Sequence, residues 1–161
     1  MVAQRNERTQ RKVDATVTKI EIGLAVANSF SPKVGEVHMN VKGKTPAGKD
    51  SFKLDSVVVV SNGEGGDTAY VIECAQSPQI GKVMKLLKKT ALFEKSPEAK
   101  TPPFLNCKLF IPVLGGRLIS KAVLSRCHAE RIGLVTVSGA GFTYHRSLFT
   151  CARHALKLIT K

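Results

Sequence analysis

Two spacings of apolar residues follow one another along the chain, and their order predicts an α/β fold. Apolar and polar residues alternate over 37–42, which is the period of a half-buried strand. The segments 52–60 and 68–75 are nearly unbroken apolar runs rich in β-branched residues, as in strands that are covered on both faces. Two more buried strands are predicted over 107–113 and 134–137.

Apolar residues at helical spacing predict four helices among these strands. The first is expected to begin at an N-cap, Asp14, and to bury Val17 and Ile20. The second is expected to bury one face made of Ile80, Val83, Met84, Leu87 and Ala91. The helices are predicted over residues 14–29, 80–93, 118–133 and 147–160. The elements therefore run in the order αβββαβαβα, which gives one mixed β-sheet flanked by helices.

The length and composition fit one domain. The chain has 161 residues, and 43% of them are apolar, which is enough for a real core. Residues 1–12 are polar and basic without periodicity, so we expect a flexible basic arm followed by a single domain over 13–161. No apolar run approaches the roughly 20 residues that cross a bilayer, which predicts a soluble protein without a membrane partner.

The spacing of the cysteines indicates the redox state of the compartment in which the protein is expected. The four of them stand at positions 74, 107, 127 and 151, without Cys-x-x-Cys pairs or the close spacing of a disulfide framework. We therefore expect reduced thiols and an intracellular, reducing compartment. The nucleus, the cytoplasm and an organelle matrix all fit this expectation.

The charge indicates a polyanionic partner. The chain carries 25 Lys and Arg against 12 Asp and Glu, a formal net charge of +13. The excess is concentrated after Thr101, where nine basic residues face only Glu130. This distribution predicts nucleic acid, either DNA or RNA, as the partner. The residues expected to contact it are Lys82, Lys85, Lys89, Arg117, Lys121, Tyr144, Arg146, Arg153 and Lys157.

Two acidic residues stand inside predicted strands. Asp55 lies within the run 52–60, and Glu73 lies near the end of the run 68–75. A buried carboxylate is costly unless it is paired, protonated or bound to a cation. Two of them on neighbouring strands therefore indicate a metal or phosphate site. The simpler alternative is that both point out of the sheet or pair with basic side chains.

These acids, and the order of the elements around them, resemble the PD-(D/E)XK nuclease superfamily. The resemblance covers residues 14–137 and rests on Leu54-Asp55, on Tyr70-Val-Ile-Glu73-Cys-Ala75, and on the helix, strand, helix and strand that follow. It implies a restriction-endonuclease-like core in which Asp55 and Glu73 bind Mg²⁺, with Glu21 as a further acid. Mg²⁺ in such a site would organise the attacking water and stabilise charge on the scissile phosphate.

The chain departs from the family pattern at one position. The family's lysine would stand two residues after Glu73, where this sequence has Ala75. Alanine cannot stabilise the charge that develops on a phosphate. Lys53, Gln76 and Lys82 are candidate substitutes. Lys53 is the best placed of the three, because the period of two in a strand puts its side chain beside that of Asp55.

The sequence therefore favours a nucleic-acid-binding protein with a nuclease-like fold and impaired catalysis. In one alternative, Asp55, Glu73 and a relocated lysine form an active Mg²⁺-dependent nuclease. In another, the chain is a structural RNA-binding component of a ribonucleoprotein or viral particle, as the basic arm over 1–12 suggests.

Overall fold

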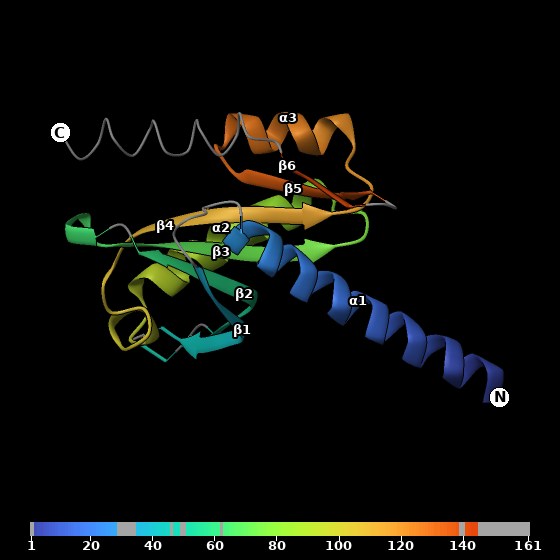
Figure 1. The fold of residues 1–161 in the computed structure, drawn as a ribbon, viewed down its shortest axis with the longest axis horizontal. Coiled ribbons are helices and arrows are strands. Elements are labelled where there is room, and N and C mark those ends of the chain that lie inside the picture. The colour runs from blue at the N-terminus through green and yellow to red at the C-terminus, as the bar shows by residue number, and fades with distance from the viewer. Residues whose placement is uncertain are drawn as a thin grey trace.

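A mixed β-sheet with helices on both faces forms the body of the molecule (Figure 1). The computed structural model describes residues 2–28, 35–45, 47–48, 51–61, 63–138 and 141–144. Its helices are α1 (Val2–Asn28), α2 (Ile80–Lys95) and α3 (Lys121–Ala129), with short 3₁₀ turns η1 (Gly63–Gly65) and η2 (Glu98–Lys100). Its strands are β1 (Gly35–Lys44), β2 (Ser51–Ser61), β3 (Asp67–Ala75), β4 (Cys107–Gly116), β5 (Gly133–Ser138) and β6 (Gly141–Tyr144).

The six strands lie side by side in chain order. The β3–β4 and β4–β5 pairs are parallel, and the other neighbouring pairs are antiparallel. Each parallel pair is joined by a crossover through a helix, first α2 and then α3, as parallel strands require. These two helices pack on one face of the sheet, while the C-terminal part of α1 packs on β1, β2 and β3 from the other. The prediction of one α/β domain with a mixed sheet between helices is confirmed.

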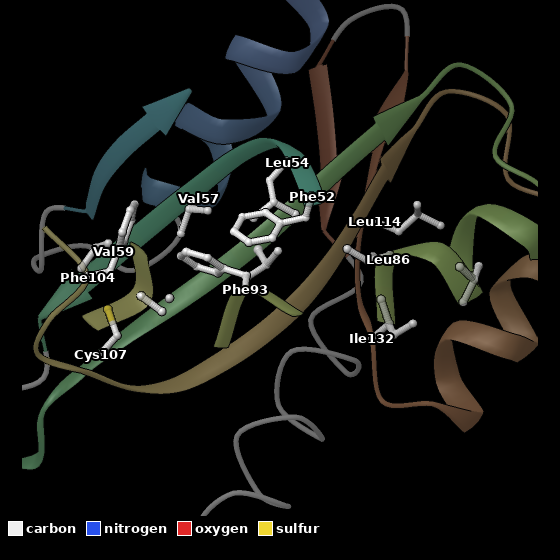
Figure 2. Packing of buried hydrophobic residues seen from close by; sticks show 14 of the residues in the cluster. Phe52, Leu54, Val57, Val59, Leu86, Phe93, Phe104, Cys107, Leu114 and Ile132 are labelled. Carbon is white, nitrogen blue, oxygen red and sulfur yellow. The ribbon is translucent and has the colours of Figure 1, made fainter. Parts of the chain in front are cut away.

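The valine run of β2 contributes side chains to two cores, one on each face of the sheet. Val57 and Val59 belong to the cluster under α2 and α3, whereas Val58 and Val60 pack in a second cluster with Ile22 of α1. This alternation explains why the run is apolar without interruption. Figure 2 shows the first cluster, in which Phe93 of α2 lies among sheet and loop side chains. The Phe93 ring makes edge contacts with Phe52, Phe104 and Phe110 at centroid distances of 5.7, 5.1 and 5.6 Å.

The alternation of β2 breaks once, at Asp55 and Ser56. Leu54 and Val57 both belong to the cluster under α2, although they stand three positions apart instead of an even number. Asp55 is bound to a side chain of α1, and the Ser56 hydroxyl lies 3.6 Å from where a Cβ would stand on Gly23 of α1. Two consecutive side chains therefore face the same helix, as happens at a bulge-like irregularity.

Helix α1 begins much earlier than predicted. The expectation of an irregular arm over 1–12 is wrong for residues 2–12, which are helical. Asp14 is not an N-cap but lies within the helix, where its carboxylate accepts a hydrogen bond of 2.9 Å from Gln10 Nε2 one turn earlier. The segment 2–22 contains no Gly or Pro that would stop helix formation. Figure 1 shows this N-terminal part extending beyond the sheet.

The predicted buried faces of two helices are wrong in part, although Val83 of α2 is buried as predicted. Val17 and Ile20 of α1 are 46% and 41% exposed, and Ile80 and Met84 of α2 are 45% and 42% exposed. The side of each helix that faces the sheet is not the side that carries these residues. It carries lysines instead, and these lysines bind buried carboxylates of the sheet. The stripes that face the sheet are Lys19, Ile22 and Gly23 in α1, and Lys82, Leu86, Lys89 and Phe93 in α2.

The C-terminal part of the described chain differs from the prediction in two ways. The helix predicted over 118–133 is shorter, Lys121–Ala129, and the short edge strand β6, which was not predicted, pairs with β5. The helix predicted over 147–160 lies outside the described residues. Within the described part, no helix has both the length and the apolar character needed to span a bilayer.

Candidate functional site

Asp55 of β2 and Glu73 of β3 meet on neighbouring strands near the centre of the sheet. Only 9% of Asp55 and 2% of Glu73 is exposed to solvent. The backbone N–H of Cys74, the residue after Glu73, donates a hydrogen bond of 2.8 Å to Asp55 Oδ2. Glu73 is also close enough to Asp55 to influence the protonation of its carboxyl group.

A lysine from α1 neutralises Asp55. Lys19 Nζ lies 2.8 Å from Asp55 Oδ1. Burial by itself would raise the pKa of Asp55, but the hydrogen bond from Lys19 and the Cys74 N–H outweigh it, and the pKa is lowered. The same hydrogen bond raises the pKa of Lys19 above its ordinary value, against the opposing effect of burial. Both groups are therefore charged at neutral pH.

Two lysines from α2 hold Glu73. Lys82 Nζ lies 3.1 Å from Glu73 Oε2, and Lys89 Nζ lies 2.6 Å from Glu73 Oε1. The two lysines are seven residues apart, about two helical turns, so they share one face of α2. Lys89 also donates a hydrogen bond of 2.8 Å to the backbone carbonyl of Lys53. This second bond ties β2 and β3 to the same helix.

Every oxygen of the two carboxylates has a hydrogen-bond donor in this cluster, and the donors are three lysine ammonium groups and one backbone N–H. Hard oxygen ligands are the right chemistry for Mg²⁺, but these oxygens are already bound, and three cations surround two anions. The predicted third acid, Glu21, is exposed and does not join them. Among the described residues, no three His, Cys, Asp or Glu side chains are grouped closely enough to hold a metal ion. The arrangement does not fit the Mg²⁺ site that the resemblance implied.

The predicted substitutes for the family's lysine lie in different places. The Lys53 side chain is exposed, and Asp55 takes its ammonium partner from Lys19 instead. Gln76 is also exposed, and its carbonyl accepts hydrogen bonds from the backbone N–H groups of Arg117 and Leu118. Lys82 does reach the site, where it binds Glu73.

A cavity of about 540 Å³ opens beside this cluster, between α1 and the ends of β3 and β4. Lys19, Cys74 and Ala75 connect it to the two carboxylates. Burial raises the pKa of the Cys74 thiol to about 12, so this wall of the cavity is uncharged. The lining residues are Arg11, Asp14, Val17, Lys19, Glu21, Cys74, Ala75, Gln76 and Arg117. Ala75, whose methyl group is too small to fill this space, thus lines a recess with three basic and two acidic side chains.

Sequence reasoning missed Arg11 and Lys19. Arg11 falls within the expected arm over 1–12, and Lys19 is not among the residues expected to be buried in the first helix. The one available signal was helical spacing: Lys19 stands three residues before Ile22 and four before Gly23, on the stripe that faces the sheet.

The other predicted nucleic-acid contacts are spread over the molecule. Lys85, Arg117 and Lys121 are exposed, whereas Lys82 and Lys89 are engaged with Glu73. Tyr144 is the last residue of β6. Arg146, Arg153 and Lys157 lie outside the described residues.

Comparisons with known proteins give no functional assignment. No family matches the chain, and no curated protein matches it. Among solved structures, a crystal structure of a protein of unknown function, AF1548, aligns with a TM-score of 0.46 and 17% sequence identity. The alignment covers 73% of this chain and 58% of AF1548, so the chain spans less than two thirds of that protein. At this level of similarity the match carries no argument about function.

Proposed function

We propose that the chain is a nucleic-acid-binding protein whose restriction-endonuclease-like core no longer relies on a metal ion. The observation that carries this proposal is the engagement of Asp55 and Glu73 by three lysines. Two carboxylates and three ammonium groups leave the cluster with one net positive charge. Such a cluster attracts a phosphate and repels a divalent cation.

The surroundings of the cluster favour a phosphate ligand. Arg11 and Arg117 line the same cavity as Lys19. The planar guanidinium fork binds phosphate oxygens in a bidentate manner, which an isolated lysine cannot do. Phosphate contacts of this kind give affinity without sequence preference.

The order of elements supports the nuclease-like core. From α1 through β5 the described elements follow the order expected from the resemblance, and Asp55 and Glu73 occupy its two acidic positions. The departure is Ala75, where the family's lysine is missing. Lysines from the two flanking helices supply the positive charge in its place, and they do so by pairing with the acids.

The proposal is tested by measuring binding to labelled single-stranded DNA, duplex DNA and RNA. Fluorescence anisotropy at several salt concentrations gives the affinity for each probe. We expect the logarithm of the affinity to fall linearly with the logarithm of the salt concentration for the wild type. Replacement of Arg11 and Arg117 by Gln should reduce this slope by about 1.4 on single strands, because each phosphate contact contributes about 0.7. A matched control, Lys88→Gln with Lys95→Gln, removes the same charge from exposed positions of α2. Absence of binding to all three probes would refute the proposal.

The same probes decide between binding and catalysis. They are incubated with Mg²⁺ or Mn²⁺ and, separately, with EDTA. We expect no metal-dependent cleavage. Cleavage that requires the metal and disappears in Asp55→Ala would overturn the proposal in favour of an active nuclease.

A further inference from the structure

The hairpin of β1 and β2 places lysines directly opposite one another. Lys42 of β1 and Lys53 of β2 are cross-strand partners in the antiparallel register. Lys44 stands two residues after Lys42 and therefore projects from the same face. Val41, Phe52 and Leu54, which alternate with these lysines, pack in or against the core under α2. The three lysines, called here the lysine ribbon, therefore face away from the core, and all three are exposed.

This arrangement is unfavourable for a protein without a ligand. Like charges directly opposite each other on neighbouring strands destabilise a sheet. Within the part of the chain that the structure describes, none of the three lysines forms a salt bridge. Within the described part of the chain, Glu98 approaches the hairpin, but its carboxylate lies where a side chain on Gly43 would project. Gly43 is paired with Phe52 on the core side, so Glu98 contacts the opposite face of the hairpin.

The lysine ribbon also borders a hollow and the Asp55–Glu73 cluster. A cavity of about 350 Å³ is lined by the three lysines together with Gly43, Ser51 and Phe52. Lys53 stands two residues before Asp55, and Lys89 Nζ binds both the Lys53 carbonyl and Glu73. A polyanion that enters the 540 Å³ cavity beside the cluster is therefore close to Lys53. From Lys53 the lysine ribbon continues along the hairpin to Lys42 and Lys44.

We infer that the lysine ribbon is a second phosphate-binding surface for the backbone of the same nucleic-acid strand. This inference rests on the proposed function and adds to it a place where the strand leaves the site. The phosphates supply the negative charge that the cross-strand pair lacks. Contacts between lysines and phosphates carry no sequence information, so the contact is independent of sequence.

The test compares Lys42→Gln with Lys53→Gln, as a double variant, against the matched control Lys88→Gln with Lys95→Gln. The probe is a short labelled single-stranded DNA, titrated at several salt concentrations. We expect the ribbon variant to lose about 1.4 from the slope of log affinity against log salt, and the control to keep the slope of the wild type. In direct terms, a fourfold reduction in salt should increase the affinity of the wild type about sevenfold more than that of the ribbon variant.

Two measurements keep this inference separable from the proposed function. If the wild type binds and the ribbon variant keeps the full slope, the inference is wrong while the proposed function stands. If the wild type binds no probe, the proposed function itself fails. Thermal unfolding without nucleic acid, at low salt, supplies a second readout. The ribbon variant should unfold at a higher temperature than the wild type, because a repulsive pair is removed. A lower unfolding temperature would contradict the argument that the pair lacks a partner.

Discussion

The strongest test of the carboxylate–lysine cluster is the removal of Lys89. Its ammonium group lies 2.6 Å from Glu73 Oε1 and 2.8 Å from the Lys53 carbonyl. Lys89→Met keeps the apolar stem of the side chain and removes only the charge and its hydrogen bonds. Glu73, which is 2% exposed, would then keep Lys82 as its remaining ammonium partner.

The magnitude follows from the burial of Glu73. Removing one partner of a fully buried ion pair costs about 3–5 kcal/mol, because a buried charge is left uncompensated. Here the cost is smaller, since Lys82 remains and the Lys89 side chain is 31% exposed, so we expect about 2 kcal/mol. For a chain of this size that corresponds to a fall of about 4–8 °C in the unfolding temperature.

Thermal and urea denaturation of four variants would measure this effect: Lys89→Met, Glu73→Gln, the two combined, and a control. Lys88→Met is the matched control, because Lys88 is the neighbouring residue of α2 and is exposed. Glu73→Gln combined with Lys89→Met should cost less than the sum of the two single changes, since the buried charge is gone when its partner is removed. If Lys89→Met cost no more than Lys88→Met, within about 0.5 kcal/mol, the account of the cluster would be refuted.

Three further predictions concern stability. The lowered pKa of Asp55 means that its ionised form stabilises the fold above the unfolded pKa of about 3.9, and that this contribution is lost as the pH falls through the lower folded value. In urea denaturation, the stability gap between wild type and Asp55→Asn should therefore be constant from neutral pH to about pH 5 and shrink at more acidic pH. A gap that widened on acidification would contradict this sign. Gly115→Ala should destabilise by about 1–3 kcal/mol, because the new Cβ would lie 2.7 Å from Ile22 Cδ1 and force α1 away from the sheet. Gly81→Ala should instead stabilise α2 by about 0.5 kcal/mol in the same assay, since nothing lies within 4 Å of the new methyl group; a loss of stability there would count against the described packing.

The strands could be predicted closely from the sequence, and the buried face of α1 could not. The predicted ends of β2 and β3 lie within about one residue of the observed ends. A continuous run of valines and isoleucines is typical of a strand that is covered on both faces. The face of α1 was misjudged because a polar residue, Lys19, occupies the stripe that packs on the sheet. Apolar spacing alone points to Val17 and Ile20, and only the position of a buried carboxylate reverses the choice.

The acids of the candidate site could be predicted, and their partners could not. Asp55 and Glu73 stand out because carboxylates inside apolar strands need an explanation. The period of two then selected Lys53 as the cation beside Asp55, but the side chains of β2 stop alternating at Asp55 and Ser56. The actual partner, Lys19, stands 36 positions away in the sequence, so only the packing of α1 on the sheet reveals it.

The carboxylate–lysine cluster also affects how a change in nucleic-acid affinity is interpreted when one of its acids is neutralised. Asp55 fastens α1 to one face of the sheet, and Glu73 fastens α2 to the other, while the Cys74 N–H joins the two carboxylates' strands. Neutralising either acid therefore frees lysines that could bind phosphate, yet it also loosens the helix that carries them. A purely electrostatic role predicts tighter binding in Glu73→Gln, because negative charge is removed from beside the polyanion. A role in holding the basic helices in place predicts weaker binding together with reduced stability. Affinity and unfolding temperature measured on the same variant separate the two, and a gain in affinity without a loss of stability would show that the acids do not serve as anchors.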